Sequence, residues 1–309
     1  MTEKMATRQA YGKTLLELGE KYPELVVMDA DLSKSTMTVE FGKAYPERFF
    51  NMGIAEQNLY GAAAGLALSG KTVCASTFAM FASGRAFEII RNSIGYTGAN
   101  VKICATHAGI TVGEDGASHQ TFEDIALMRT VPGMTVINPS DGVSAAELLR
   151  QAAAYKGPCY IRLGRAAVPV FYSENDHITM GRGNTVRQGK DAAVIATGIM
   201  VNEAFTAAER LSEEGIDVRV IDIHTIKPID EDIIVKAAEE TGAIVTAEEH
   251  SVIGGLGSAV AEVTARRAPV KIRMVGQQDT FGESGKPDQL REKYGMTWQD
   301  IVRGIKELV

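Results

Sequence analysis

The stretch VKICATHAGITVGEDGASHQ, residues 101–120, decides how this chain folds. Its first six residues are mostly apolar and predict a short buried strand, whereas the next fourteen are polar and rich in glycine. These fourteen include two of the five histidines, two acids and three glycines. Side-chain packing does not explain such a composition, and ligands of open α/β sheets bind at the carboxyl ends of strands. The stretch therefore predicts a functional loop at the end of a buried parallel strand.

Strands and helices alternate on both sides of this stretch. Apolar runs predict further strands at residues 25–28, 72–75, 135–138 and 158–163. Helical spacing of apolar residues, small residues and capping residues predict helices at residues 5–22, 56–68, 81–94, 121–129 and 140–155. This alternation is typical of a parallel sheet that helices cover on both faces.

A polar, glycine-containing segment at residues 172–190 interrupts the alternation and marks a domain boundary. A second set of predicted elements follows, with strands at 192–196, 218–221, 243–247 and 270–275, helices at 202–214, 231–241 and 255–266, and two short helical patterns near Gln289 and Trp298. We therefore expect an α/β protein of two doubly wound domains, spanning residues 1–175 and 188–309.

The composition argues against several classes of protein. The 309 residues are 45% apolar, and 32 Lys and Arg against 39 Asp and Glu leave a net charge of −7, which argues against nucleic-acid binding. The most apolar helical stretch is far shorter than the roughly 20 residues that cross a membrane. The polar amino terminus lacks a secretory signal, and three widely spaced cysteines predict free thiols, so we expect a cytoplasmic protein.

Two further segments carry candidate functional side chains. Glu56, in GIAEQN at residues 53–58, opens a predicted helix of small residues. It is either a charge that the helix dipole favours or a buried functional acid, and the first is the commoner case. Phe78 and Phe81 follow the strand at 72–75 and are either core residues or cofactor contacts. The chain has no close pair of His or Cys ligands, so we expect no metal site in it.

Together these segments resemble the pyrimidine-binding domain of transketolase. The matching motifs lie at residues 53–58, 76–81 followed by 85–91, 107–120, 131–132, 139–142 and 161–165. The second half resembles the transketolase C-terminal domain, with Glu-Glu-His at 248–250 and Gly-Gly-Leu-Gly at 254–257. The resemblance implies a pyrimidine-binding domain for thiamine diphosphate, with a mostly parallel sheet, followed by a smaller α/β domain.

For Glu56 the resemblance implies a hydrogen bond to a pyrimidine nitrogen of thiamine diphosphate. A protonated carboxyl at that nitrogen favours the imino tautomer, whose exocyclic nitrogen takes the proton from thiazolium C2. Burial beside an apolar ring helps a carboxyl to hold that proton. The cofactor then serves as the electron sink for the carbanion.

The resemblance gives roles to other residues as well. Phe78 and Phe81 match aromatic contacts of the pyrimidine ring. His107 and His119 match catalytic histidines that contact hydroxyls of the cofactor-bound sugar, and we expect His119 to touch the cofactor too.

The resemblance also implies a binding site for the sugar substrates. Asp115 matches the residue that reads the 2-hydroxyl of the acceptor. Arg8, Ser35 and Arg165 match a sugar-phosphate clamp, because two guanidinium groups and a hydroxyl suit a phosphate. Without the resemblance, each arginine would be interpreted as an ordinary surface charge.

The chain lacks the Gly-Asp-Gly signature with which full-length transketolase holds Mg²⁺ and the diphosphate. The nearest strings are Glu-Asp-Gly at 114–116 and Ser-Asp-Gly at 140–142. The resemblance therefore implies the beta-type subunit of a split transketolase, whose separate N-terminal subunit holds the Mg²⁺ in an α2β2 assembly. Such an enzyme moves a two-carbon ketol unit from a ketose phosphate to an aldose phosphate, with pentose-phosphate ketols as the expected substrates.

Three alternatives share parts of this pattern. Deoxyxylulose-phosphate synthase and the beta subunit of a 2-oxo-acid decarboxylase carry the same glutamate and domain plan. The synthase typically has Asp-Arg-Ala-Gly where Thr-His-Ala-Gly stands at residues 106–109. A non-catalytic assembly subunit would keep the fold, but it would have no use for the candidate site residues.

Overall fold

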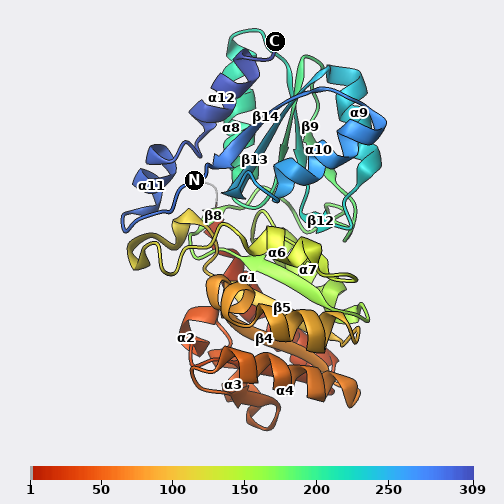
Figure 1. The fold of residues 1–309 in the computed structure, drawn as a ribbon, viewed down its shortest axis with the longest axis vertical. Helices are drawn as coiled ribbons and strands as arrows, with labels where there is room; N and C mark the ends of the chain where they lie inside the picture. The colour runs from red at the N-terminus through yellow and green to blue at the C-terminus, as the bar shows by residue number, and fades with distance from the viewer. Residues whose placement is uncertain (1–2) are drawn as a thin grey trace.

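The computed structural model describes residues 3–309 and consists of two stacked α/β halves (Figure 1). Met1 and Thr2, with which the first predicted domain begins, lie outside the described residues. Each half is built on a sheet whose strands are mostly parallel, which confirms the predicted α/β fold class.

The first sheet has seven strands in the order β12-β6-β7-β5-β4-β2-β3. These strands are β2 (Leu25–Asp29), β3 (Phe49–Asn51), β4 (Thr72–Phe78), β5 (Val101–Thr106), β6 (Thr135–Ile137), β7 (Cys159–Leu163) and β12 (Thr225–Lys227). All neighbours pair parallel except β12 and β6, which pair antiparallel. A short antiparallel pair, β1 (Lys4–Met5) and β8 (Val168–Pro169), joins the amino terminus to the segment after β7.

Helices cover both faces of this sheet. One face packs against α4 (Glu56–Leu68), the helical segment 81–95 and α6 (Asp124–Thr130). The other face packs against α1 (Thr7–Lys21), α3 (Val39–Ala44) and α7 (Gly142–Ala154). Successive strand side chains point to opposite faces, so a strand buried on both faces is a continuous apolar run. For this reason, apolar runs alone were enough to predict β2, β4, β5, β6 and β7 from the sequence.

The segment 81–95 is helical, as predicted, but its geometry is not uniformly α. The single turn α5 (Phe87–Ile89) lies between two π-helical turns, Phe81–Arg85 and Ile90–Gly95. Single π-helical turns are frequent at functional sites. The first of these turns follows β4 and carries Phe81, one of the predicted cofactor contacts.

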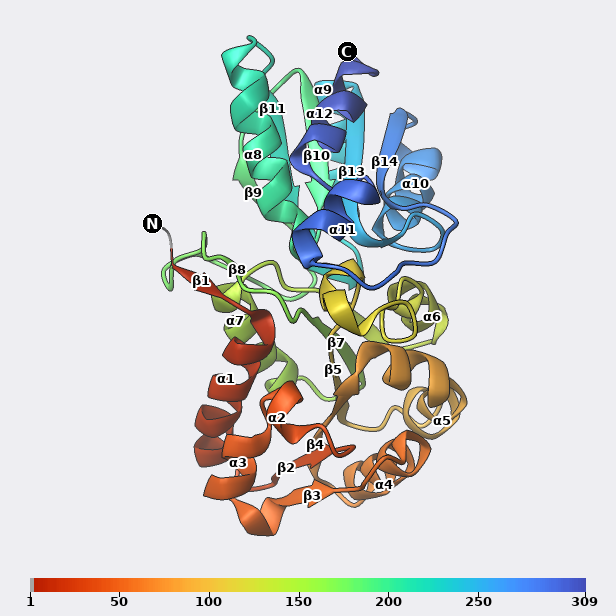
Figure 2. The ribbon, with the colours of Figure 1, turned by 90° about the vertical axis from the view of Figure 1, so that its left-hand side faces the viewer.

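The second sheet has five strands in the order β14-β13-β10-β11-β9. They are β9 (Asn184–Arg187), β10 (Ala192–Ala196), β11 (Val218–Asp222), β13 (Ala243–Ser251) and β14 (Lys271–Gln277), of which only β9 runs antiparallel to its neighbour. The helices α8 (Met200–Glu213) and α12 (Trp298–Lys306) cover one face, and α9 (Glu231–Thr241) and α10 (Leu256–Arg267) cover the other. The short helix α11 (Pro287–Lys293) lies between the halves, against the loop that follows β5 (Figure 2).

The two halves share one strand. By its position in the sequence β12 belongs to the second half, yet it pairs with β6 at the edge of the first sheet. Ile226 of β12 is part of a continuous apolar core that runs from the first sheet to α9 and α10. The short strands β3, β9 and β12 are absent from the predicted elements, because three or four residues carry too little pattern.

Among residues 3–309, no helix is long and apolar enough to cross a membrane. Cys74, Cys104 and Cys159 are buried and unpaired, as predicted. All three lie in the core on one face of the first sheet, beside Tyr11 of α1.

Candidate active site

Most of the predicted site residues gather at one edge of the first sheet, where five adjacent strands end. Arg165 follows β7, His107 follows β5, Phe78 ends β4, Ser35 follows β2, and Glu56 follows β3. The chain passes from β3 on one side of β2 to β4 on the other, so the strand order reverses between β2 and β4. The crevice at such a reversal, at the carboxyl ends of the strands, is the usual ligand site of an open α/β sheet.

Glu56 begins α4, and only 2% of its side chain is exposed. Its two carboxylate oxygens accept hydrogen bonds from Nη1 of Arg85, at 3.1 and 3.0 Å. The guanidinium of Arg85 also lies over the Phe81 ring, 4.7 Å from its centroid, and half of the Arg85 side chain is exposed. The buried carboxylate and the ring face therefore lie within reach of one planar cation.

An aromatic cluster extends from Phe81. The Phe78 ring stacks on Phe81 with 6.0 Å between centroids, and on His107 with 4.0 Å. The rings of His119 and Phe81 meet edge to face at 5.3 Å. The cluster brings together two histidines from opposite ends of the loop at 107–120.

The backbone of His107 is in the left-handed region, with φ of 57°. Residues other than glycine rarely adopt this conformation, and such strain clusters at functional sites. Nδ1 of His107 lies 2.9 Å from Oγ1 of Thr106, and Nε2 lies 3.4 Å from Nη1 of Arg8. Because a guanidinium can only donate, Nε2 is the acceptor and the ring proton is on Nδ1.

Charge and burial keep His107 neutral. Burial, followed by the positive charges of Arg8, Arg165 and His119, lowers the pKa of His107 to about 3. A neutral imidazole at pH 7 therefore lies among positively charged groups. With its proton on Nδ1, such a ring can accept a hydrogen bond from a hydroxyl at Nε2, in place of Arg8, without adding charge to the site.

Arg8 reaches from α1 into this cluster. Its Nη1 donates to the carbonyl oxygen of Ser35 at 2.7 Å, so the Ser35 backbone and not the hydroxyl makes the contact. Its Nε is buried and has no hydrogen-bond partner within residues 3–309. Burial and the nearby charge of Arg165 lower the pKa of Arg8. A buried donor without a partner is costly, and an anion bound between the two guanidinium groups would satisfy it.

The middle of the loop at 107–120 forms fewer contacts with the site residues than its two histidines do. Arg165 donates to the carbonyl oxygen of Val112 and to Glu114, whose oxygen lies at 3.1 Å. Asp115 ends a 3₁₀ turn and is exposed; within the described chain it forms no hydrogen bond with another predicted site residue. Within residues 3–309, neither Asp115 nor Arg165 is therefore hydrogen-bonded to another predicted site residue.

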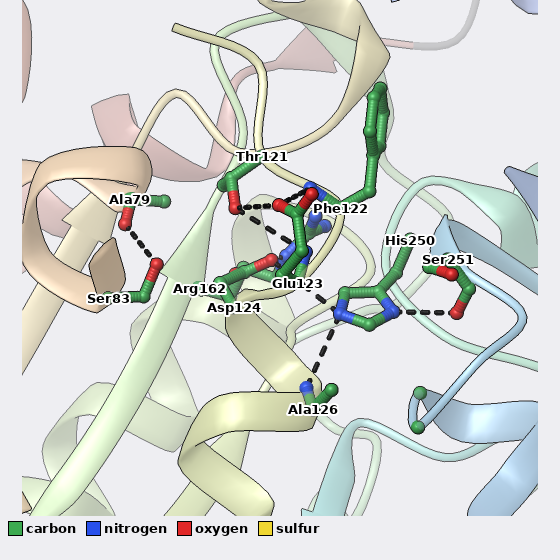
Figure 3. A network of polar contacts seen from close by, with 12 residues as sticks. Ala79, Ser83, Thr121, Phe122, Glu123, Asp124, Ala126, Arg162, His250 and Ser251 are labelled. Atoms are coloured by element: carbon green, nitrogen blue, oxygen red, sulfur yellow. Dashed lines mark hydrogen bonds and ion pairs between the residues drawn. The ribbon is translucent and has the colours of Figure 1, made fainter. Parts of the chain in front are cut away.

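A buried polar network lies beneath the loop, where the two halves meet (Figure 3). Arg162 and Asp124 form an ion pair at 2.8 Å, and both side chains are almost fully buried. His250 of β13 approaches the same carboxylate at 4.0 Å and accepts a hydrogen bond from the Ala126 backbone. Glu249, the neighbour of His250, accepts a hydrogen bond from the loop itself, at Thr111.

Arg85 and Glu249 are absent from the predicted site. Arg85 lies 29 residues from its partner Glu56, and Glu249 lies 138 residues from Thr111. No local sequence pattern predicts contacts between residues so far apart. In the sequence, both residues are recognisable only as members of larger motifs.

The residues present fit the pyrimidine end of thiamine diphosphate. A protonated aminopyrimidine is a planar cation, as is the guanidinium that already pairs with Glu56 and stacks on Phe81. The same carboxylate and ring face therefore suit the heterocycle. Within residues 3–309, no group of three or more His, Cys, Asp or Glu side chains could hold a metal ion.

Comparisons with known proteins agree with this geometry. Residues 3–170 match the model for the transketolase pyrimidine-binding domain, and residues 181–301 match that for the transketolase C-terminal domain. A Methanocaldococcus jannaschii protein described as a putative transketolase C-terminal section is 53% identical, over 97% of this chain and 95% of its own length.

Two further matches are close in length. A 6-deoxy-6-sulfo-D-fructose transketolase subunit of Clostridium sp. is 44% identical over 97% of this chain and 94% of its own. A solved structure described as a split-gene transketolase, inactive beta4 tetramer, has a TM-score of 0.93 and 56% identity, with 98% of each chain covered. The resemblance in the sequence is thereby confirmed, and this chain belongs to the transketolase family, with its pyrimidine-binding and C-terminal domains.

Proposed function

We propose that this chain is the beta-type subunit of a split transketolase. With a separate diphosphate-binding subunit, it transfers a two-carbon ketol unit from a ketose phosphate to an aldose phosphate. The observation that carries the proposal is the buried Glu56 carboxylate beside the Phe81 ring, both held by one planar cation. When bound, thiamine diphosphate supplies the electron sink for carbanion chemistry.

In this proposal, Glu56 holds a proton at the pyrimidine nitrogen, and Phe78 and Phe81 orient the ring by stacking. Arg85 gives up its contact with Glu56 when the ring enters, which its half-exposed side chain allows. Because Arg85 stays close to the carboxylate, we infer that it influences how the proton is shared between Glu56 and the ring.

His107 and His119 contact hydroxyl groups of the substrate. The low pKa of His107 supports this role, because a neutral ring can hydrogen-bond a hydroxyl over the whole physiological pH range. Asp115, on the exposed side of the same loop, reads the hydroxyl of the incoming acceptor.

Arg8 and Arg165, with Ser35, bind the anionic end of the sugar. The unpartnered Nε of Arg8 supports this assignment. A guanidinium pair binds a phosphate or a sulfonate by the same bidentate hydrogen bonding. The relatives differ in substrate, since one of them is described as acting on 6-deoxy-6-sulfo-D-fructose. We propose sugar phosphates for this chain, with pentose-phosphate ketols tested first.

The partner in this proposal is an N-terminal transketolase subunit that holds Mg²⁺ and the diphosphate, in an α2β2 assembly. Support comes from relatives of nearly the same length, of which this chain covers 94–98%. A similar chain is described as a C-terminal section, and a solved relative is described as an inactive beta4 tetramer. The description "inactive" also favours a second candidate function, in which the chain is an assembly subunit that does not catalyse ketol transfer.

One mixing experiment separates the two candidates. The chain is assayed alone and together with an N-terminal transketolase subunit, with thiamine diphosphate, Mg²⁺ and sugar phosphates. The proposal predicts ketol transfer only in the mixture. A complex that forms but remains inactive would support the assembly role, and full activity of this chain alone would contradict the split enzyme.

A further inference from the structure

Glu249 lies near the end of β13 in the second half, and its side chain reaches the active-site loop of the first. The residue is 3% exposed. Its Oε1 accepts a hydrogen bond of 2.6 Å from the backbone N–H of Thr111. Thr111 lies in the loop that carries Asp115 and His119. A charged acceptor makes a backbone hydrogen bond shorter and stronger than a neutral one does, so this contact is a firm attachment point.

The loop backbone fits closely around this carboxylate. Gly109 has φ of 79°, and a Cβ at that position would lie 2.6 Å from Oε1 of Glu249. Only glycine allows both the backbone angle and the close approach. At the other end of the loop, Gln120 donates to the carbonyl oxygens of Ile110 and Glu283, at 3.3 and 3.0 Å. Both ends of the loop therefore rest on the second half.

Glu249 is itself fixed in place by the first half. Nη2 of Arg162 donates to the Glu249 carbonyl oxygen at 2.8 Å, while Nε of Arg162 pairs with Asp124 (Figure 3). Removing one member of a buried ion pair is strongly destabilising, so this arrangement resists rearrangement. The carboxylate of Glu249 thus has a defined position relative to the first sheet.

The neighbouring Glu248 provides an internal comparison. It is fully buried on the same strand, and its carboxylate accepts hydrogen bonds from the backbone N–H groups of Leu256 and Gly257, at 2.6 and 2.8 Å. These donors begin α10 in the second half itself. Glu248 and Glu249 therefore share residue type, burial and acceptor role, but only Glu249 contacts the loop.

We propose that Glu249 is a positioning residue for substrate binding, which holds the loop at 107–120 in the conformation that presents Asp115 and His119 to the sugar. This inference rests on the proposed function of that loop. It gives the C-terminal domain a part in building the active site. The Glu56–Arg85 pair takes no part in the hydrogen bond between Glu249 and Thr111. Loss of that bond should therefore change the affinity for the cofactor less than the KM for sugar phosphates.

The first test needs no activity and uses the full chain. We expect backbone amide hydrogen exchange at residues 108–120 to accelerate about tenfold or more in Glu249→Leu, which removes the acceptor. Glu249→Gln keeps an acceptor oxygen and retains slow exchange. Glu248→Leu accelerates exchange at the start of α10 and leaves the loop unchanged. Slow loop exchange in Glu249→Leu, or equal acceleration in Glu248→Leu, would overturn the inference.

The second test uses the assembled enzyme. We expect Glu249→Leu to raise the KM for the ketose phosphate about 10- to 100-fold, the effect of losing one hydrogen bond to a charged group, with a smaller change in kcat. Glu249→Gln restores most of the loss, and Glu248→Leu keeps the wild-type KM. An unchanged KM in Glu249→Leu, with its loop exchange accelerated, would contradict the positioning role. A wild-type assembly without ketol transfer would instead contradict the proposed function and leave the exchange result standing.

Discussion

The carboxyl edges of the two sheets face each other across the middle of the molecule, and they differ in how their polar groups are partnered (Figures 1 and 2). At the first edge, within residues 3–309, Nε of Arg8 is buried without a hydrogen-bond partner, and the Glu56 side chain is hydrogen-bonded only by the half-exposed Arg85. At the second edge, Oδ2 of Asp222 accepts hydrogen bonds from Ser140 and Tyr172, which both belong to the first half, while its Oδ1 is buried without a hydrogen-bond partner among residues 3–309.

This difference refines the rule that ligands of α/β sheets bind at the carboxyl ends of strands. Both edges satisfy the rule by topology, but the first half of the chain already occupies the second edge. Thr197 and Glu249 near the ends of β10 and β13 also bond to the first half. The ligand site is therefore marked by charged groups, such as Arg8 and Glu56, that the other half of the described chain does not pair, and not by the position at the edge alone.

Among the three variants that test this comparison, the largest expected effect on activity concerns the anion site of the first edge. Arg8→Met should lower kcat/KM for a phosphorylated sugar about 10- to 100-fold, because a charged hydrogen bond contributes about 1.5–3 kcal/mol. An unphosphorylated analogue should lose little. Arg150→Met is the matched control, since Arg150 forms an exposed ion pair with Glu17. Equal losses for both kinds of sugar would show that Arg8 does not bind the phosphate.

A smaller effect on activity is expected at the second edge, where burial raises the pKa of Asp222 to about 7, against an ordinary value of 3.8. The folded state thus binds the proton more tightly than the unfolded state does. The contribution of this group to stability is complete below pH 3.8 and is lost as the pH rises through 7.

Asp222→Asn removes this titration, so the free energy of unfolding of the variant relative to wild type should rise by a few kcal/mol between pH 4 and pH 8. Denaturant unfolding at several pH values measures the difference. Turnover should stay at the wild-type level. A constant difference across the pH range would mean that Asp222 does not titrate as burial implies.

The smallest effect is expected for Thr197→Val, also at the second edge. Oγ1 of Thr197 donates to the carbonyl oxygen of Asn138 at 3.3 Å, and the side chain is fully buried. Loss of this hydrogen bond should cost about 1 kcal/mol of stability and leave kcat/KM unchanged. If kcat/KM fell while stability did not, the second edge would take part in ligand binding, and the first edge would not be the only ligand site of the two.

Much of the fold could be predicted from the sequence, because its main elements have strong local patterns. The limits of α4, β5 and α9 agree with the predicted ranges, since an apolar run or helical periodicity defines each. The strand β12 could not be predicted. Its three residues form a strand only because β6 supplies hydrogen-bond partners from the other half.

The same distinction applies to the candidate site: its residues could be identified from local sequence motifs, but contacts between distant segments could not. His107 stands out because it follows a predicted strand in a segment of unusual composition, whereas Glu56 and Phe81 receive their predicted roles only through the resemblance. The contacts of Arg85 with Glu56 and of Glu249 with Thr111 depend on packing between segments that are distant in the sequence. They can be identified only from the folded structure. Ser35 was predicted as a hydroxyl ligand, and its observed contact with Arg8 is through the backbone, which residue type does not reveal.

The most direct test of the central claim is deuterium exchange at thiazolium C2 of thiamine diphosphate in the assembled enzyme, wild type against Glu56→Gln. The account predicts that the variant still assembles and that exchange slows by about 10²- to 10⁴-fold, because the amide cannot share a proton with the pyrimidine nitrogen. Exchange at the wild-type rate in an intact Glu56→Gln assembly would contradict the assignment of the first edge as the cofactor site.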